Sequence, residues 1–292
     1  MSAASSAPVP AGAAEPPHRY RRRHRRAMLA GLATVVVAAG ALASSPAAYA
    51  VLGGADVARG ARPYQVIVVS EARGSCGGSL INDRVVVTAA HCVMGPINQV
   101  LQVKAGNVDK RGRWQTRSSR TVVTHPDWKL NDGGDVAIIV LTRAFTLNAD
   151  VQPIRLATDG QIRRATTGVV SGWGALSDAE DPDYPDVMQQ VEVPLFTDAD
   201  CADALGVNPS RSMCAGSEGV DSCGGDSGGP LTITTSTGAV RLAGVVNWGY
   251  GCGLASGSAY ARMPYYSPWI DGWRTNPFKQ RQPEEVPPPN DR

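Results

Sequence analysis

Seven short segments rich in valine, isoleucine and threonine, separated by turn residues, place the strongest limit on how this chain can fold. They cover residues 65–70, 84–88, 100–104, 135–141, 167–171, 231–235 and 242–247. Segments of this length, in a chain with 32 glycines and 21 prolines, favour an all-β sandwich or barrel. The pattern alone leaves both architectures open.

The first 50 residues differ from the rest of the chain. Six arginines between residues 19 and 26 precede an apolar run over residues 27–43, and small residues follow up to Ala48-Tyr49-Ala50. A basic head, a hydrophobic segment and a small-residue cleavage site are typical of a secretory signal peptide. The apolar run is shorter than the ~20 residues that span a membrane. We therefore predict a signal peptide over residues 1–50 and a secreted, extracellular protein, with an uncleaved anchor as the alternative.

The export route stays open, because Arg25-Arg26 also fits the twin-arginine signal. Cleavage changes the charge of the chain. The segment holds six of the 28 Lys and Arg residues and one of the 26 Asp and Glu residues, so 22 basic and 25 acidic side chains remain. The mature protein is then slightly acidic, without a basic run interleaved with aromatics, and we predict no nucleic-acid partner and no stable membrane association.

Six cysteines follow the predicted cleavage site: Cys76, Cys92, Cys201, Cys214, Cys223 and Cys252. An even set in an exported chain predicts disulfides, although counting alone allows about 15 connectivities. A zinc site is a poor alternative, because no Cys-x-x-Cys pair occurs and only two histidines follow residue 50.

Three segments carry the chemistry: Thr88-Ala89-Ala90-His91-Cys92, Gly134-Asp135-Val136-Ala137 and Gly225-Asp226-Ser227-Gly228-Gly229-Pro230. A serine hydroxyl is a weak nucleophile near neutral pH, so it needs a base to take its proton and an acid to orient that base. These segments supply a histidine, a carboxylate and a serine. They therefore predict nucleophilic catalysis by the serine.

Of the two histidines after residue 50, His91 follows the apolar residues Val85-Val86-Val87 and adjoins Cys92, which favours it as the general base over a buried structural histidine. His125 lies in the turn-like sequence Thr124-His125-Pro126, and we predict a structural role for it.

Two aspartates are candidates for the carboxylate. Asp135 opens an apolar strand and is expected beside the core, whereas Asp132 lies among asparagine and glycines in a loop-like sequence. We assign the role to Asp135.

The order His91, Asp135, Ser227, with the residues around each, resembles the trypsin/chymotrypsin family of serine proteases, and the leader is similar to those of secreted bacterial members. The resemblance covers roughly residues 51–274. It implies an all-β fold of two antiparallel six-stranded β-barrels with the active site in the cleft between them, and a short C-terminal helix. We predict a protease domain over residues 51–275 and a disordered, Pro-rich tail over residues 276–292.

The same resemblance implies further pairings. It joins Cys76 to Cys92, Cys201 to Cys214, and Cys223 to Cys252. It also implies an oxyanion hole formed by the N–H groups of Gly225 and Ser227. Asp226 is expected to pair with the α-amine of a mature N-terminus, which Val51-Leu52-Gly53-Gly54 resembles. Because Val51 directly follows the predicted cleavage site, we hypothesise that export processing alone creates that amine.

Substrate preference is expected to depend on Asp221, six residues before Ser227, where trypsin-like members carry an aspartate at the base of the primary pocket. A desolvated carboxylate selects an Arg or Lys side chain. Asn247, Trp248, Gly249, Gly251 and Ser258 are expected to line the same pocket, and the two glycines leave its mouth open.

Two departures from the family pattern bear on this preference. Ser258 stands where the pocket usually has glycine, and it could narrow the pocket. Asn247 replaces the serine usual before Trp248, and its amide could bond Asp135. We predict cleavage after Arg or Lys, with a chymotrypsin- or elastase-like preference, or a catalytically silent binding homologue, as alternatives.

No metal or cofactor is predicted, since the loop over residues 107–115 combines Asp109 with Lys110, Arg111 and Arg113 and offers too few oxygen ligands for calcium. The expected partners are protein or peptide substrates and protein protease inhibitors, and the expected state is a monomer.

Overall fold

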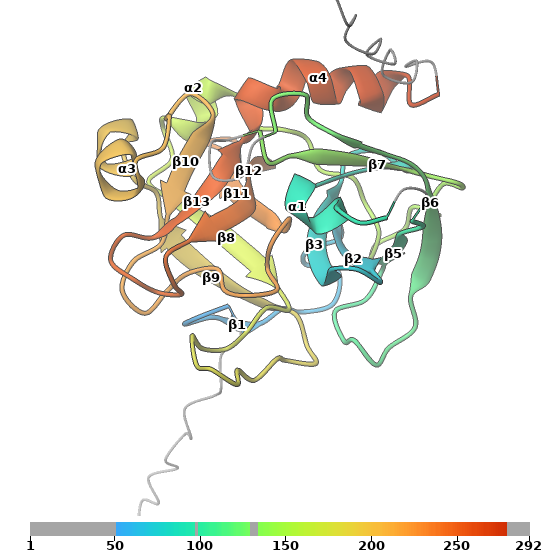
Figure 1. Cartoon of the computed structure of the whole chain (residues 1–292), viewed down its shortest axis with the longest axis horizontal. Helices are drawn as coiled ribbons and strands as arrows, with labels where there is room; N and C mark the ends of the chain where they lie inside the picture. Colours follow the sequence, from blue (N-terminus) through green and yellow to red (C-terminus); the bar gives the residue numbers. More distant parts are fainter. Residues whose placement is uncertain (1–50, 97–98, 129–133, 279–292) are drawn as a thin grey trace, which may run out of the picture. The chain divides into compact units, whose positions relative to one another are not determined.

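The described residues of the computed structural model, 51–96, 99–128 and 134–278, form strands that belong mainly to two antiparallel β-barrels (Figure 1). The predicted signal peptide and most of the predicted tail lie outside these residues. Within them, no helix combines the length and apolarity needed to cross a membrane. The all-β prediction is confirmed.

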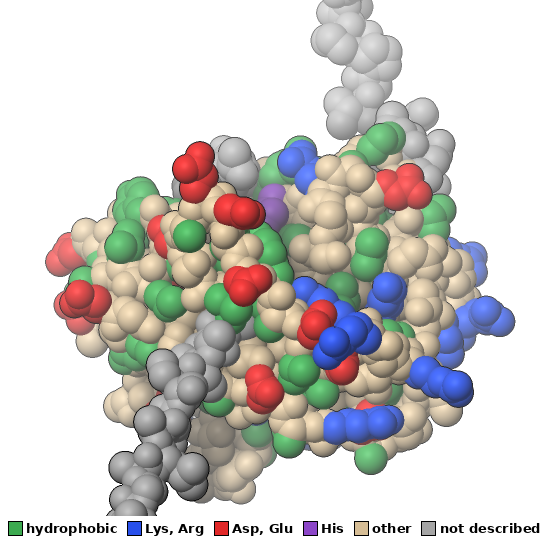
Figure 2. All heavy atoms as spheres, turned by 90° about the horizontal axis from the view of Figure 1, so that it is seen from below, with side chains coloured by type: hydrophobic (Ala, Val, Ile, Leu, Met, Phe, Trp, Pro, Cys, Tyr) green, Lys and Arg blue, Asp and Glu red, His purple; other side chains and the backbone are tan. Residues whose placement is uncertain are grey.

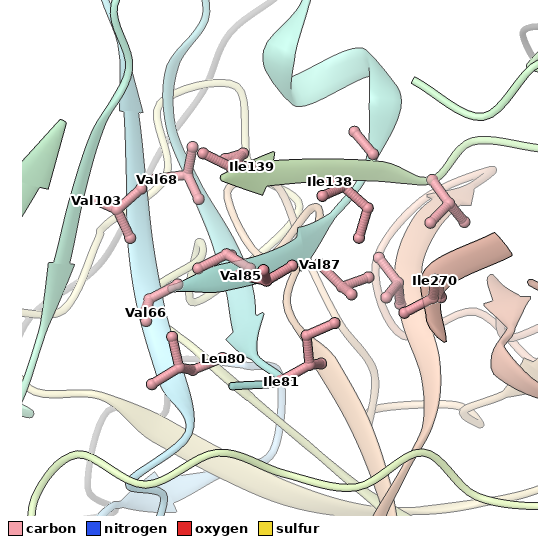
Figure 3. Close-up of a cluster of buried hydrophobic side chains, with 14 of the residues drawn as sticks. Val66, Val68, Leu80, Ile81, Val85, Val87, Val103, Ile138, Ile139 and Ile270 are labelled. Atoms are coloured by element: carbon pink, nitrogen blue, oxygen red, sulfur yellow. The ribbon is translucent and has the colours of Figure 1, made fainter. Parts of the chain in front are cut away.

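The first barrel closes in the order β2 (Gln65–Ser70), β3 (Gly74–Leu80), β4 (Val85–Thr88), β7 (Ala137–Leu141), β6 (Gln115–Thr124) and β5 (Gln102–Ala105). β4 and β7 are buried along their whole lengths. This explains why both read as continuous apolar runs, since strands covered on both faces lose the alternation of a half-exposed sheet. Val85 and Val87 of β4 pack beside Ile138 and Ile139 of β7 (Figure 3).

The second barrel contains β9 (Gln189–Pro194), β8 (Thr167–Gly172), β11 (Pro230–Thr234), β12 (Val240–Gly249), β13 (Ser258–Arg262) and β10 (Ser212–Ala215), in that order. β10 returns to the end of β9 through two backbone bonds, Gly216 N–H to Pro194 O over 3.0 Å and Phe196 N–H to Cys214 O over 2.9 Å. The six strands thus close, and β1 (Ala55–Asp56) adds a short seventh strand beside β9.

Helix α4 (Met263–Thr275) links the two barrels. It follows β13 of the second barrel directly, yet its buried side chains Tyr266, Ile270 and Trp273 belong to the hydrophobic core of the first barrel. Their spacing of three and four residues forms one apolar helical face. In Figure 1 the helix runs along one side of the molecule above both barrels, and the predicted C-terminal helix is confirmed.

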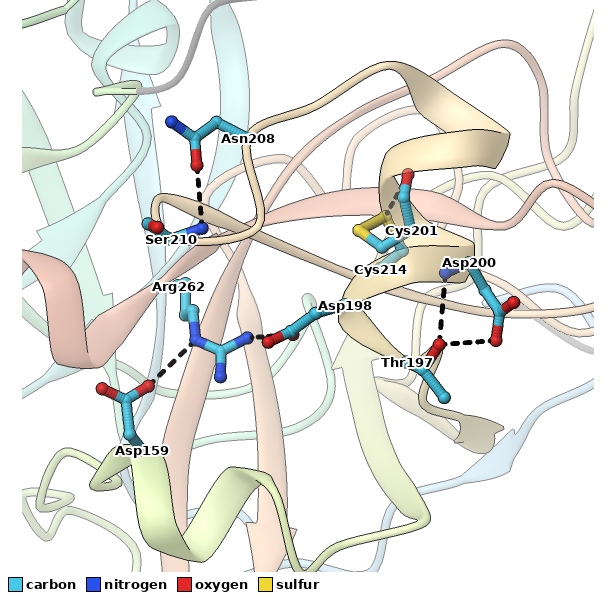
Figure 4. Close-up of polar contacts among 9 residues, drawn as sticks. All are labelled: Asp159, Thr197, Asp198, Asp200, Cys201, Asn208, Ser210, Cys214 and Arg262. Atoms are coloured by element: carbon cyan, nitrogen blue, oxygen red, sulfur yellow. Dashed lines mark hydrogen bonds and ion pairs between the residues drawn. A yellow bond between two sulfur atoms is a disulfide. The ribbon is translucent and has the colours of Figure 1, made fainter.

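A buried arginine fastens two short helices to the second barrel. Arg262, only 3% exposed, bonds Asp159 of α2 (Asp159–Ile162) over 3.0 Å and Asp198 of α3 (Asp198–Leu205) over 2.9 Å (Figure 4). The Cys201–Cys214 disulfide joins α3 to β10 beside this cluster. A buried cation needs such partners, because an unpaired charge in the interior is strongly destabilising.

Candidate active site

His91 and Asp135 meet because their segments are neighbours in the first barrel. β4 and β7 pair with Thr88 opposite Ala137, and His91 follows Thr88 in the short helix α1 (Ala90–Val93), while Asp135 precedes Ala137. His91 Nδ1 lies 2.7 Å from Asp135 Oδ2, and the His91 backbone N–H donates to Asp135 Oδ1 over 2.9 Å. Asp135 is buried and His91 is partly exposed. The carboxylate therefore orients the ring and leaves Nε2 for proton transfer. The alternative carboxylate, Asp132, lies outside the described residues.

Trp128 makes a third contact to the carboxylate, one that the sequence did not predict. Its Nε1–H donates to Asp135 Oδ1 over 3.1 Å. Asn247, expected to reach Asp135, forms no side-chain bond with it within the described part of the chain, and lies instead where the register of β12 against β13 shifts. Trp128 lies seven positions before Asp135, but no pattern in the sequence marks it as a contact of the carboxylate.

Ser227 lies half-buried in the loop before β11, held by both barrels. Its carbonyl accepts the Gly77 N–H from the first barrel over 2.8 Å, and the neighbouring Gly228 N–H donates to Val246 O of the second over 2.8 Å. Among the described residues its hydroxyl forms no hydrogen bond with His91. Catalytic hydrogen bonds in unliganded sites are often long and tighten when substrate binds.

Gly228 brings the serine loop against the strand that leads to His91. Its φ of 77° lies in the left-handed region, and a Cβ there would overlap Thr88 Oγ1 and lie 3.0 Å from Ala89 N. Only glycine combines this backbone with so close an approach. The loop of Ser227 is therefore packed next to α1.

Two backbone N–H groups at the serine are open to a ligand. Those of Gly225 and Ser227 have no acceptor among the hydrogen bonds of the described residues, whereas the intervening Asp226 N–H donates to Cys223 O over 3.0 Å. Gly225 has a φ of 95°, which a residue with a side chain rarely adopts. This arrangement is suited to bind the oxyanion of a tetrahedral intermediate.

Asp226 is 1% exposed and accepts two backbone N–H groups, from Gly174 over 2.8 Å and from Cys223 over 3.0 Å. Burial raises the pKa of its carboxyl to about 6, against the lowering effect of these hydrogen bonds. Val51 is fully buried in the core of the second barrel with a φ of 52°. A β-branched residue in this region is a conformational outlier.

Asp221 is fully buried, and its carboxylate is bonded by its own surroundings. The Ser258 hydroxyl donates to Oδ2 over 2.8 Å, and the Ser222 N–H donates to Oδ1 over 2.7 Å. Longer bonds come from Gly253 N–H and the Tyr260 hydroxyl, each over 3.4 Å. Burial raises the pKa of this carboxyl to about 6, although the hydrogen bonds act in the opposite direction.

A cavity of about 330 Å³ adjoins Ser227 and Ser258. Its other lining residues include Asn247, Trp248, Gly249 and Gly251, all expected there from the sequence, and Asp178 and Tyr250, which were not. A Cβ at Gly249 would lie 2.7 Å from Ser258 Oγ, and one at Gly251 would lie 2.7 Å from Asp178 Oδ2. Asp221 is not part of the lining, because Ser258 stands at the surface of the cavity next to it.

All six cysteines are paired as expected: Cys76–Cys92, Cys201–Cys214 and Cys223–Cys252. The first disulfide joins β3 to the helix of His91, and the third joins the loop of Ser227 to the wall of the cavity. In the described part of the chain, the two groups of three potential metal ligands each contain a disulfide. Disulfide sulfurs are not thiolates, so neither group is suited to bind a metal.

Comparison with known proteins agrees with this geometry. Residues 51–270 match the family model described as Trypsin. Trypsin-1 of Astacus astacus is 37% identical over 237 residues, which cover 75% of this chain and 98% of that protein. Trypsin I-P1 of Gallus gallus is 36% identical over 228 residues, 75% of this chain and 87% of that protein. Vitellin-degrading protease of Bombyx mori is 33% identical over 235 residues, which cover 77% of this chain and 86% of that protein. These relatives are animal proteins. The chain belongs to the trypsin family of serine proteases.

Proposed function

We propose that the protein is a serine endopeptidase in which Ser227 is the nucleophile, His91 the general base and Asp135 the residue that orients and stabilises His91. The observation that carries this proposal is the buried Asp135 carboxylate bonded twice to His91, next to a serine loop with two open N–H groups. Each part has a defined place in acyl transfer.

In the first step the Ser227 hydroxyl attacks the substrate carbonyl carbon and its proton moves to His91 Nε2. The carbonyl oxygen becomes an oxyanion bound by the N–H groups of Gly225 and Ser227. The amine of the substrate leaves with the proton from His91, and an acyl ester remains on Ser227. Water, deprotonated by His91, then hydrolyses the ester. Loss of one oxyanion donor typically costs about 10²–10³ in turnover, and loss of the carboxylate about 10⁴.

We propose that the side chain before the scissile bond is Arg or Lys and that it enters the cavity beside Ser258. Two carboxylates support this assignment, Asp178 in the lining and Asp221 directly behind Ser258. Both favour a cation, Asp178 from the lining itself and the buried Asp221 through its short distance from that lining.

A neutral-residue preference is the second candidate, and a specific observation favours it. Asp221 is 0% exposed and its oxygens already accept several hydrogen bonds, so an Arg side chain would have to displace the Ser258 hydroxyl to reach it directly. A chymotrypsin- or elastase-like enzyme is expected if Ser258 stays in place.

We also propose that signal cleavage before Val51 activates the protein, and that the mature form is an extracellular monomer open to protein inhibitors. The left-handed φ of Val51 supports this. In the uncleaved chain such a φ costs about 1–2 kcal/mol. Cleavage removes the preceding carbonyl that defines this angle, so it relieves the cost and frees an amine for Asp226. The proposal that this is a secreted protease of the bacterial type rests on the composition of the leader.

The test is cleavage of small reporters ending in Arg, Lys, Phe or Ala by secreted protein, with Ser227→Ala as the control, after N-terminal sequencing. Cleavage of the Arg and Lys reporters that the control lacks supports the proposal. Cleavage of only the Phe or Ala reporter supports the second candidate. Silence on all four, from protein that begins at Val51, would make the chain a binding homologue.

A further inference from the structure

A second cavity, of about 510 Å³, also adjoins the serine loop. Its lining includes Gly225, Cys76 and Gly77, whereas the lining of the first cavity includes Gly224 and Ser227, and the two linings share no residue. The cavities therefore adjoin successive parts of the serine loop, the second lined largely by strands of the first barrel and the first by β12 and the residues that follow it. A polypeptide bound across Ser227, with the side chain before the scissile bond in the first cavity, extends into the second with the residues that follow the bond.

The second cavity differs from the first in its charge. Arg73, Lys104 and Lys110 line it, and the sole acidic residue in the lining is Asp226. Asp226 is 1% exposed and its two oxygens are engaged by backbone N–H groups, so it contributes little to the open surface. Once paired with an N-terminal amine, as proposed above, it would contribute still less.

The three cations are not neutralised by the protein. Within the described residues, none forms a salt bridge with a carboxylate, whereas Arg59, Arg111, Arg211, Arg262 and Arg274 all do. Arg73 bonds the carbonyl of Met94, and the Lys110 ammonium lies 5.8 Å from the centre of the Tyr184 ring. Partial burial lowers the pKa of Lys110, against the effect of Asp186 and Asp226. An entering carboxylate would stabilise the ammonium.

The same contrast extends over the surface. In Figure 2, Lys and Arg side chains gather on the half that carries the first barrel, and most Asp and Glu side chains lie on the other half. Next to the serine this places Asp178 in the first cavity and three cations in the second. The cleft thus changes sign across the scissile bond.

We infer that the cavity lined by Arg73, Lys104 and Lys110 selects substrates with an acidic side chain, Asp or Glu, in the first residues after the scissile bond. This inference rests on the proposed protease activity. Tyr184, 53% exposed, and Trp114 form aromatic walls that hold the peptide stem, and the cations bind the carboxylate. Because the contact is near the surface, its strength falls as salt screens it.

The experiment uses three amidated peptides that share one segment up to the cleaved residue and carry Glu, Gln or Lys at both of the next two positions. The cleaved residue is the one that the protein prefers in the small reporters. Those reporters carry no residue after the cleaved bond, so they test the proposed activity alone. Each kcat/KM is divided by the value for the reporter. We expect Glu to exceed Gln by about tenfold and Lys to fall below Gln, since each near-surface pair contributes up to about fivefold.

The double variant Lys104→Gln/Lys110→Gln is expected to reduce the Glu-to-Gln ratio to about one or two. Arg143→Gln, at an exposed position of the first barrel outside the cavity lining, is the matched control and keeps the ratio of the wild type. A free-acid form of the Gln peptide tests whether a terminal carboxylate serves instead. Any of three results would overturn the inference while the reporter is cleaved. The Glu and Gln peptides could be cleaved at equal rates, or the Glu-to-Gln ratio could stay unchanged in the double variant. Only the free-acid Gln peptide could also be preferred. An inactive reporter would instead overturn the proposed function.

Discussion

Ser258 Oγ donates a hydrogen bond to Asp221 Oδ2 over 2.8 Å, so a hydroxyl covers the carboxylate on which a preference for basic residues depends. The cover also explains why Asp221 is fully buried while Ser258 lines the cavity. Removing this hydroxyl should uncover the charge.

Ser258→Gly is therefore expected to raise kcat/KM for an Arg reporter by about tenfold or more, because direct contact with a desolvated carboxylate discriminates strongly among side chains. Steady-state kinetics on Arg and Phe reporters measures the change. Ser210→Gly, at an exposed turn, is the matched control. An unchanged Arg rate would mean that the hydroxyl does not limit access to Asp221.

Asp221 also predicts an acid limit for the binding of cations. Burial raises the pKa of its carboxyl to about 6, so the group is charged above that pH and becomes neutral below it. The dissociation constant of benzamidine, a small aromatic cation, for the Ser227→Ala variant should rise by up to about tenfold per pH unit below pH 6. Calorimetric titration between pH 4.5 and pH 8 would measure it, and a constant affinity over this range would contradict the assignment.

Trp128→Phe keeps the aromatic volume but removes the bond to Asp135. We expect a decrease in kcat of about tenfold to a hundredfold, as for the loss of one hydrogen bond to a charged group. As a positioning residue, Trp128 should also change the pH profile of kcat/KM, which reports the groups of the free enzyme. Trp269→Phe serves as the comparison, because this indole of α4 packs against His125, lines neither cavity and forms no hydrogen bond with Asp135 in the described structure. A profile that overlays that of the wild type would mean that Trp128 serves packing alone.

The uncleaved and mature chains should differ in how their stability depends on pH. In the uncleaved chain the Asp226 carboxyl has its pKa raised to about 6 from 3.8, so the folded state binds its proton more tightly than the unfolded chain. The free energy of unfolding then falls as the pH rises between those values. An amine at Val51 would reverse the sign, because a paired carboxylate has a lowered pKa and stabilises at higher pH.

Urea unfolding of two Ser227→Ala proteins, one uncleaved and one beginning at Val51, tests this between pH 4 and pH 7. Asp221 contributes equally to both, so their difference isolates Asp226. The mature form should gain stability over the uncleaved form as the pH rises. Parallel curves would show that Val51 and Asp226 do not pair.

Much of the candidate site could be predicted from the sequence, because its residues lie in short motifs whose order carries information. The structure brings His91 and Asp135 into contact, and each flanks an apolar strand of the same barrel. Trp128 could not be identified, since its contact with Asp135 depends on tertiary structure that no local sequence pattern encodes. The bond from Ser258 to Asp221 likewise depends on the position of one strand against a distant loop.

Strand prediction failed where the strand lacks apolar residues. β3 contains three glycines and reads as a turn, yet Gly77 must be small, because a Cβ there would lie 2.6 Å from Gly229 Cα. β6 is mostly polar and partly exposed along most of its length, so it lacks the apolar run by which the other strands were predicted. The sequence alone could not choose between a sandwich and a barrel, since closure depends on bonds such as that from Gly216 to Pro194.

Helix α4 imposes an order on biosynthesis. Its Tyr266 hydroxyl accepts the N–H of Gly134 over 2.7 Å, next to Asp135, and its Ile270 and Trp273 complete the core of the barrel that is translated first. The half of the site that carries His91 and Asp135 therefore cannot reach its final packing until nearly the whole chain has been synthesised. Nascent chains truncated before residue 263 would lack this packing, which keeps the peptidase unassembled while it is still being made.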